Sequence, residues 1–377
     1  MMKPLIEMDG VFKGSQLRLA RHYWGKTLND IAEDIGTTRQ YVSQLENGKG
    51  KLKLDDPTTR DLARSLHVAP TFFFKPVGVS LSEEQAHFRK LATTKASMKQ
   101  KVLARGTVFD QLVEFIDTKV RLPAVDFPDE SGAETTEEIE QAAERLRSYW
   151  GLGFGPISHM VRVVERAGAV VTLFQDTSTE VDALSITSRR PVIVRNEAKQ
   201  SPFRLRFDIA HELGHLVLHE GQVTGDRKTE SEANRFASAF LIPRSTFLKA
   251  FPRRGSRLDW VGISKMKMDF QVSKAAIIYR AKALGLIDDY QYRGAVIYLK
   301  NQGEGITEKE DPFCVREQPE MIKTALKVLY EHHGITHEAL AEQLGITPEF
   351  LAEVLPTGLD IQKPTNLTPR SGLKLVK

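Results

Sequence analysis

The segment FDIAHELGHLVLH, residues 207–219, places two histidines four positions apart, with a glutamate directly after the first. Residues at positions i and i+4 lie on one face of an α-helix, so a helix here directs His211 and His215 toward the same point. Glu212 lies about 100° farther round that helix, near enough to reach a metal-bound water without being a ligand itself. The segment therefore predicts a helix that carries two metal ligands and a general base.

A catalytic zinc ion takes three protein ligands and keeps one open position, so a third ligand is required. In the metzincin pattern it would be a histidine at position 221 after a glycine at 218, whereas this sequence has Gly221 and Leu218. His219 shares the helical face but lies two turns from His211, and one straight helix does not wrap three ligands around one ion. We therefore expect the third ligand to come from another element.

The segment TESEANRFASAFLIP, residues 229–243, predicts that element. Its apolar stripe consists of Ala233, Phe236, Ala237, Phe240 and Leu241. At 100° per residue, Glu230 lies about 50° from the centre of this stripe and Glu232 about 110°. A core-facing carboxylate is unfavourable without a partner, and a metal ion would be one. The pattern favours Glu230 over the alternative Glu232, and predicts that Asn234 hydrogen-bonds a ligand histidine.

The rest of the chain alternates helical and strand patterns. A length of 377 residues predicts more than one domain. Stretches rich in Pro, Gly and acidic residues predict a linker or loop at 122–136 and a loosely held tail from about 355. Periodicity predicts short helices over 12–76, a helical stretch over 82–122, helices at 136–150 and up to about 166, a strand at 170–174, a β-hairpin turning at 188–191, and helices again beyond 256.

The composition indicates the cellular compartment and limits the kinds of partner that we expect. A single cysteine, Cys314, excludes an internal disulfide framework and is typical of a reducing compartment. The first ten residues contain no apolar run of signal-peptide length, and no stretch approaches 18 uninterrupted apolar residues. We therefore expect a cytoplasmic protein without a membrane partner. The net charge is only +4, so a nucleic-acid partner has to be inferred from local features.

Residues 25–48 predict two short helices joined by a tight turn. Thr27 can cap the first helix, Gly36 can end it in the left-handed conformation, and Thr38 can cap a second helix over 39–46. The outer face of this second helix then carries Arg39, Gln40, Ser43 and Gln44. Arginine and glutamine at the start of an exposed helix suit base recognition in the DNA major groove. Basic side chains expected to contact phosphates are Lys49, Lys51, Lys53, Arg18 and Arg21.

Three stretches in this region, GSQLRLAR, TLNDIAEDIGTTRQYVSQLENG and DLARSLHVAPTFFFKP, resemble the Cro/phage-repressor (XRE) helix-turn-helix family over residues 12–76. The resemblance implies double-stranded operator DNA as a partner, with Arg39, Gln40 and Gln44 as the base-reading residues. Thr38 and Ser43 complete the expected DNA-binding set. Because such domains gain specificity by pairing two half-sites, we also expect a homodimer.

An internal repeat links this region to the end of the chain. Residues 25–45 align without gaps to the segment that begins at Gly334 over 21 positions, six of them identical. The second copy carries Pro348, Glu349 and Glu353 on the helix that corresponds to the base-reading one. Carboxylates there would be repelled by phosphates. We therefore interpret the second copy as a packing or dimerisation element.

The stretch RLRFDIAHELGHLVLH followed by ESEANRFASAFLIP looks like the ImmA/IrrE family of zinc metallopeptidases, over about residues 150–300. The family is bacterial or phage-borne, and several members carry an N-terminal repressor-type domain. The resemblance implies a Zn²⁺ cofactor and regulated cleavage of an intracellular protein, typically a repressor encoded nearby. The wider Glu-zincin pattern favours Glu230 as third ligand. This sequence has Asn234 where many relatives of that wider class carry aspartate.

Together these features predict a mainly α protein with a small β-sheet in its peptidase domain, an α+β fold. The expected parts are an all-α helix-turn-helix domain (1–76), a helical connector and loop (77–135), a zincin-like metallopeptidase domain (136–300) and a helical C-terminal region (301–377). The substrate is expected to lie in extended form along the strand at 192–195. The predicted function is a DNA-binding regulator that cleaves a partner protein.

Two other functions fit the same motifs. In one, the protein is a transcription factor whose metal site senses zinc or is structural. The presence of Glu212 argues against this, because a non-catalytic site needs no general base. In the other, the peptidase belongs to a toxin–antitoxin or phage-defence system and acts on infection or stress. The neighbouring open reading frame would distinguish this function from the first.

Overall fold

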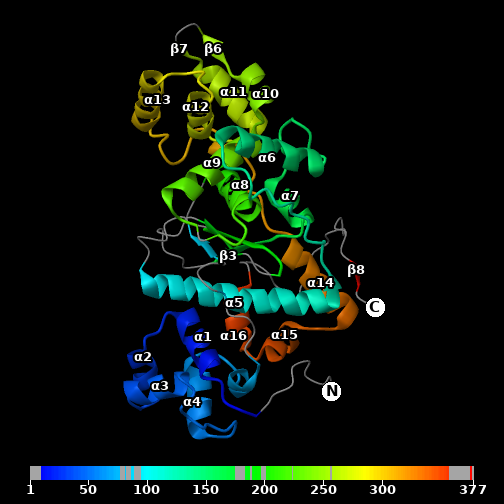
Figure 1. Ribbon diagram of the computed structural model, residues 1–377. Helices are drawn as coiled ribbons and strands as arrows, with labels where there is room; N and C mark the ends of the chain where they lie inside the picture. Colours follow the sequence, from blue (N-terminus) through cyan, green and yellow to red (C-terminus); the bar gives the residue numbers. More distant parts are fainter. Residues whose placement is uncertain are drawn as a thin grey trace. The chain divides into compact units, whose positions relative to one another are not determined.

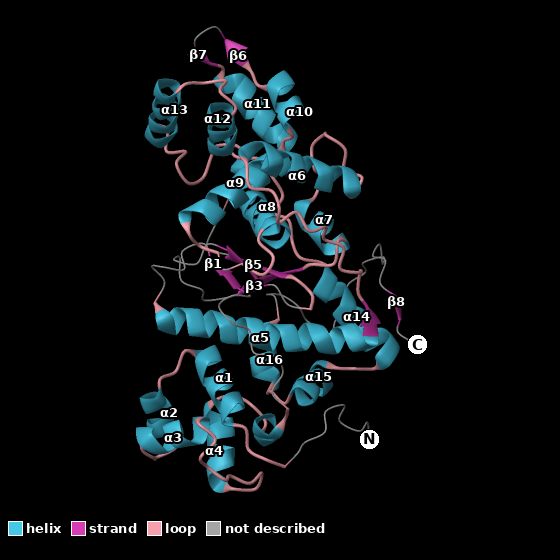
Figure 2. Cartoon of the chain, viewed as in Figure 1, coloured by secondary structure: helices cyan, strands magenta, loops and turns pink. Residues whose placement is uncertain are grey.

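The computed structural model describes residues 10–76, 81, 86–88, 95–174, 183–186, 189–196, 201–222, 224–254, 257–355 and 374–375. Helices dominate the described chain, and its principal sheet is small (Figures 1 and 2). The contacts divide the chain into two compact units. Unit 1 combines residues 1–86, 93–123 and 320–377, and unit 2 combines residues 87–92 and 124–319. The fold is therefore mainly α with a small sheet, an α+β architecture.

Unit 1 is almost entirely helical. Its elements are α1 (Gly14–Trp24), α2 (Leu28–Asp34), α3 (Arg39–Glu46), α4 (Pro57–Ser65), the 3₁₀ helix η1 (Pro70–Phe74), α5 (Ala96–Lys119), α14 (Met321–His333), α15 (His337–Leu344), α16 (Pro348–Val354) and the antiparallel pair β2 (Val120–Arg121) and β8 (Lys374–Leu375). The Thr27 side chain accepts a hydrogen bond from the Asp30 N–H, which starts α2. Gly36 follows with φ of +64°, a conformation that glycine adopts without strain. The predicted helix–turn–helix is therefore present.

The internal repeat folds into the same local structure twice. Thr336 and Thr347 cap α15 and α16 by accepting backbone N–H groups three positions on, as Thr27 and Thr38 do for α2 and α3. In the second copy, the helix that corresponds to α3 packs against other helices of unit 1. The Phe350 ring is fully buried, and its centroid lies 4.3 Å from that of Tyr23. This contact agrees with the packing role expected from its acidic sequence.

Unit 2 contains the sheet and the helices around it. Its helices are α6 (Thr136–Tyr149), α7 (Met160–Arg166), α8 (Pro202–Leu218), α9 (Arg227–Leu241), α10 (Arg244–Ala250), α11 (Trp260–Phe270), α12 (Lys274–Ala283), α13 (Asp289–Asn301) and the 3₁₀ helix η3 (Asp311–Phe313). Its strands are β1 (Ala86–Phe88, of which residue 86 is counted in unit 1), β3 (Val170–Phe174), β4 (Ala183–Ile186), β5 (Val192–Asn196), β6 (Arg253–Arg254) and β7 (Arg257–Leu258). The first four form one sheet in the order β1-β4-β5-β3. The pair β6 and β7 forms a separate antiparallel ribbon.

The sheet corrects two expectations from the sequence. Strand β5 pairs in parallel with β3 and antiparallel with β4, so both of its edges are occupied. The expected pairing of a substrate along Val192–Arg195 is therefore wrong, because pairing needs an open edge. Residues 86–88, within the stretch 82–122 expected to be helical, form strand β1 instead. Much of the rest of 82–95 lies outside the described residues, and α5 begins only at Ala96.

Helices α8 and α9 pack closely, which positions the two predicted metal-binding segments side by side (Figure 1). Gly214 lies in this contact. A Cβ atom at that position would lie 3.2 Å from both Ala233 Cα and Phe236 Cδ1, tighter than ordinary van der Waals contact. Glycine at position 214 therefore permits the close approach of the two helices.

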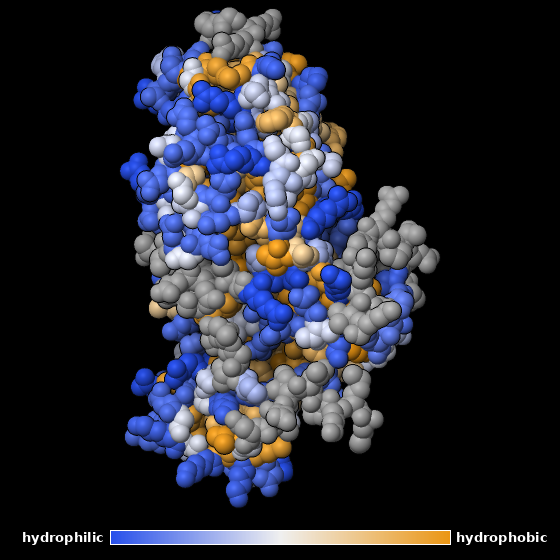
Figure 3. Space-filling model, turned by 45° about the vertical axis from the view of Figure 1, so that its right-hand side comes forward, coloured by the Kyte–Doolittle hydropathy of each residue, from blue (hydrophilic) through white to orange (hydrophobic). Residues whose placement is uncertain are grey.

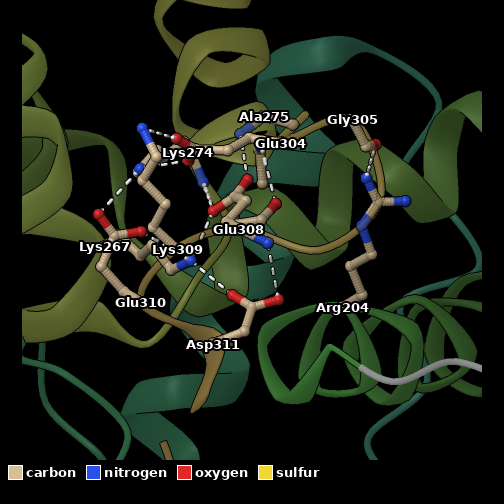
Figure 4. Close-up of polar contacts among 12 residues, drawn as sticks. Arg204, Lys267, Lys274, Ala275, Glu304, Gly305, Glu308, Lys309, Glu310 and Asp311 are labelled. Carbon is tan, nitrogen blue, oxygen red and sulfur yellow. Dashed lines mark hydrogen bonds and ion pairs between the residues drawn. The ribbon is translucent and has the colours of Figure 1, made fainter. Parts of the chain in front are cut away.

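Buried charges fix the segment after α13 against α11 and α12 (Figure 4). Lys267 Nζ lies 2.7 Å from Glu308 Oε2 and 2.6 Å from Asp311 Oδ1. Lys274 Nζ pairs in the same way with Glu304 Oε2 at 2.5 Å. Each buried ammonium therefore has carboxylate partners, which a buried charge requires.

Polar and charged side chains cover much of the face shown in Figure 3, with apolar patches between them. Among the described residues, no helix combines the length and apolar character needed to cross a bilayer.

Candidate metal centre

The two histidines of the HELGH motif meet inside unit 2. His211 and His215 lie one turn apart on α8, and each is only 1% exposed. Their Nε2 atoms are 3.1 Å apart. The i, i+4 spacing thus directs both ring nitrogens to one buried point, as helical geometry requires.

Glu230 reaches the same point from α9. The helix begins directly after Asp226, whose side chain accepts backbone N–H groups of the first turn, so Glu230 lies just inside the N-terminus. Its Oε2 atom is 3.4 Å from His211 Nε2 and its Oε1 atom is 3.3 Å from His215 Nε2. Donor atoms of these three residues all lie within 4.8 Å of one another, a grouping that could hold a metal ion.

The donor set fits zinc in chemistry and in spacing. Ligand atoms about 2.0–2.1 Å from a tetrahedral ion lie about 3.3 Å from one another, close to the 3.1, 3.3 and 3.4 Å that separate these atoms. His211 Nδ1 lies 3.0 Å from Asn234 Oδ1. Because an amide oxygen only accepts, His211 Nδ1 carries the hydrogen and Nε2 presents its lone pair to the centre. Two imidazole nitrogens and a carboxylate are a usual zinc ligand set.

The carboxylate of Glu230 is in the form that a ligand needs. Burial by itself would raise the pKa of Glu230, but hydrogen bonds and favourable charge interactions with His211 and His215, when these rings are protonated in the absence of a metal ion, lower it to about 2. The carboxyl group is therefore ionised at neutral pH.

Glu212, the expected general base, is held by a residue that the sequence did not reveal. Its side chain is buried beside the histidines, and Ser185 Oγ donates a hydrogen bond of 2.7 Å to Glu212 Oε2. Ser185 lies on β4, where its partner in register is Ile193 of β5. A serine between the apolar residues Leu184 and Ile186 was the available signal. Its contact with Glu212 depends on the packing of β4 against α8, which the sequence alone does not show.

His219 and Glu232 lie next to this centre and contact each other. His219 follows α8 as its C-terminal cap residue, and its Nε2 atom is 2.9 Å from Glu232 Oε2. Its Nδ1 atom is 3.0 Å from His215 Nδ1. Burial lowers the pKa of His219, and Glu232 opposes that effect. The structure thus brings His219 and Glu232, the two less favoured ligand candidates, together beside His215.

The predicted DNA-reading residues lie in unit 1, on α3 and its N-terminal cap. Four of the side chains are exposed and Ser43 is half-buried; the exposed ones are Thr38, Arg39, Gln40 and Gln44.

One expected phosphate contact is wrong. The Arg21 guanidinium is buried and forms two hydrogen bonds with the Glu46 carboxylate, 2.6 and 3.0 Å long. It is therefore committed to an internal ion pair, whereas Lys49, Lys51 and Lys53 are exposed.

A histidine pair on one helix and a glutamate from the next, with the first helix packed against a small sheet, define a zincin-like site. Residues 164–282 match the family model of the IrrE N-terminal-like domain, Peptidase_M78. The matched stretch lies within unit 2 and contains His211, Glu212, His215 and Glu230. The match supports a metallopeptidase of the ImmA/IrrE family. A search of curated proteins found no match to this chain.

Proposed function

We propose that this chain is a DNA-binding transcriptional regulator whose zinc-dependent endopeptidase domain cleaves a partner protein. The main support for a peptidase activity is the convergence of His211, His215 and Glu230 beside a buried Glu212. A site that only stabilised the fold would need the three ligands but no general base. The Peptidase_M78 match over these residues supports the same activity.

The residues divide the chemistry between them. His211, His215 and Glu230 would hold the ion. Bound zinc supplies a Lewis acid for the scissile carbonyl and lowers the pKa of a water molecule. The Glu212 carboxylate accepts the proton of the attacking water and passes it to the leaving amine nitrogen. The Ser185 hydroxyl holds Glu212 Oε2 and so fixes the direction of that carboxylate.

The proposed partners follow from the two units taken separately. Exposed Arg39, Gln40 and Gln44 on one helix suit an operator sequence in double-stranded DNA. We propose that the protein binds it as a homodimer in the cytoplasm, because one helix reads only a few base pairs. The proposed substrate is a repressor or antitoxin-like protein encoded nearby.

The decisive experiment incubates the purified protein with the product of its adjacent gene, with and without a chelator. We expect cleavage that the chelator abolishes. Glu212→Gln should retain zinc and lose cleavage, whereas His215→Ala should lose both, and elemental analysis with mass spectrometry of the products measures each. Full zinc occupancy in His215→Ala would reject the site. Cleavage at the wild-type rate by Glu212→Gln would leave zinc binding intact but favour a metal site that is not catalytic.

A further inference from the structure

Two buried residues outside the proposed ligand set form a hydrogen-bonded chain to one of the ligands. His219 is 2% exposed, and its two ring nitrogens contact His215 on one side and Glu232 on the other. The distances are 3.0 Å between the Nδ1 atoms of the histidines and 2.9 Å between His219 Nε2 and Glu232 Oε2. The chain therefore runs from α9 back to a ligand on α8.

The direction of the hydrogen bonds in this chain follows from its carboxylate end. An ionised carboxylate only accepts, so His219 Nε2 donates to Glu232. In a neutral imidazole the other nitrogen is then an acceptor, so His219 Nδ1 accepts from His215 Nδ1–H. That leaves the lone pair of His215 on Nε2, the atom that faces His211 and Glu230.

We propose that His219 and Glu232 are a positioning pair that fixes the tautomer and ring orientation of the metal ligand His215. This inference rests on the proposed zinc site. Hydrogen bonding to the outer nitrogen of a ligand histidine sets its orientation and raises its basicity. His219 is outside the ligand set because both of its ring nitrogens are engaged, and Glu232 is outside it because its carboxylate contacts His219 rather than the point where His211, His215 and Glu230 meet.

The two ligand histidines are held by different groups. His211 Nδ1 donates to the neutral amide oxygen of Asn234, whereas His215 donates to an imidazole backed by a carboxylate. A hydrogen bond to a charged acceptor is stronger than one to a neutral group. The outer nitrogen of His215 is thus linked to a carboxylate through His219, whereas the outer nitrogen of His211 contacts an amide.

The test measures zinc affinity by chelator competition for three variants of the full chain. His219→Ala removes the acceptor, and we expect zinc to bind about 10- to 100-fold more weakly. His219→Asn returns a carbonyl oxygen near the former Nδ1 position and should recover most of the loss. Lys228→Ala is the matched control, because Lys228 is exposed and lies 3.8 Å from the other oxygen of Glu232. It should bind zinc like the wild type.

Nitrogen-15 NMR of the imidazoles supplies a readout that does not depend on activity. In the zinc-free protein, the hydrogen of His215 should reside on Nδ1 in the wild type and in His219→Asn, and should distribute over both nitrogens in His219→Ala. Wild-type affinity in His219→Ala would overturn the proposal. Equal loss in the Ala and Asn variants would also overturn it, since the imidazole itself would then be required. Failure of the wild type to bind zinc would instead reject the proposed function.

Discussion

At the scale of single residues, two glutamates two positions apart on α9 have different environments. Glu230 faces the Nε2 atoms of both histidines, whereas Glu232 faces His219. The helical periodicity of the sequence distinguishes them, because they lie about 160° apart around the helix axis. It could not show that Glu232 also has a buried partner, since that depends on where α8 ends.

The first prediction compares these two carboxylates. Glu230→Ala removes a proposed ligand, and Glu232→Ala removes only a group that acts through His219. We expect the first change to weaken zinc binding at least about tenfold more than the second. The loss of a direct ligand removes a bond to the ion, whereas a group that only holds a ligand typically contributes about 10- to 100-fold to the affinity. Zinc retained after dialysis against a graded chelator measures both. The opposite order would show that Glu232 is the ligand.

A second prediction concerns the exposed face of α3. Arg39→Ala should lower the affinity for a specific operator by about 1–3 kcal/mol and relax the preference at one base position. Lys49→Ala should weaken binding to all sequences alike and reduce the salt dependence. Fluorescence anisotropy with duplexes from the protein's own promoter, at two salt concentrations, measures both effects. Equal affinity of the wild type for random duplex would make α3 a packing element.

At the scale of elements, local signals predicted much of the fold. The capping residues Thr27 and Thr38 mark helix starts, and the apolar run at 170–174 became β3 with the same bounds. These signals depend on a few neighbouring residues, so the sequence carries them directly. Strand order is not local. The central place of β5 depends on long-range pairing and was not predicted.

Burial of individual polar side chains escaped prediction for the same reason. Arg21 and Arg18 look equivalent on a basic helix, yet Arg21 is buried and Arg18 is partly exposed, and both contact Glu46. Only the packing of α1 against α3 decides which guanidinium remains available to phosphates. The role of α8 was predictable because His211, Glu212 and His215 lie within about one helical turn. The contact of Ser185 with Glu212 was not, because Ser185 comes from a strand distant in the sequence.

A third prediction tests the buried charge network around α11. Lys267→Met removes the ammonium that Glu308 and Asp311 share. Breaking a buried ion pair by removing one partner typically costs about 3–5 kcal/mol, because the remaining charge is unpaired. Chemical denaturation of the variant should show that loss. Lys265→Met is the control, since its exposed pair with Asp269 should contribute about 0–1 kcal/mol.

At the scale of the whole molecule, unit 1 is assembled from both ends of the chain. Residues 12–76 make backbone contacts with the second repeat: Ala69 N–H donates to Gly345 O at 2.9 Å and Thr347 N–H to His67 O at 3.0 Å. The ring of Phe350 packs against Tyr23 and Trp24. The predicted DNA-binding domain is therefore not an independent block of sequence, and the repeat near the end of the chain completes its core.

The fourth prediction follows from this shared core. Phe350→Ala should destabilise unit 1 by about 3–5 kcal/mol, the usual range for removing a buried phenylalanine ring. The unfolding of unit 2 and its zinc content should stay unchanged, because none of its described residues contribute to this cluster. Differential scanning calorimetry with metal analysis separates the two responses. Phe313→Ala, at a residue 80% exposed, is the control.

The split composition of unit 1 also sets an order of events during synthesis. A ribosome adding about 5–20 residues per second needs on the order of 10–40 s to translate residues 124–319. All of unit 2 except its short segment 87–92 is translated in that interval. Helices α1 to α5 have then been synthesised, but their partners in unit 1, α14 to α16, have not. The nascent chain therefore has every residue of its candidate metal centre before it can complete the core of unit 1.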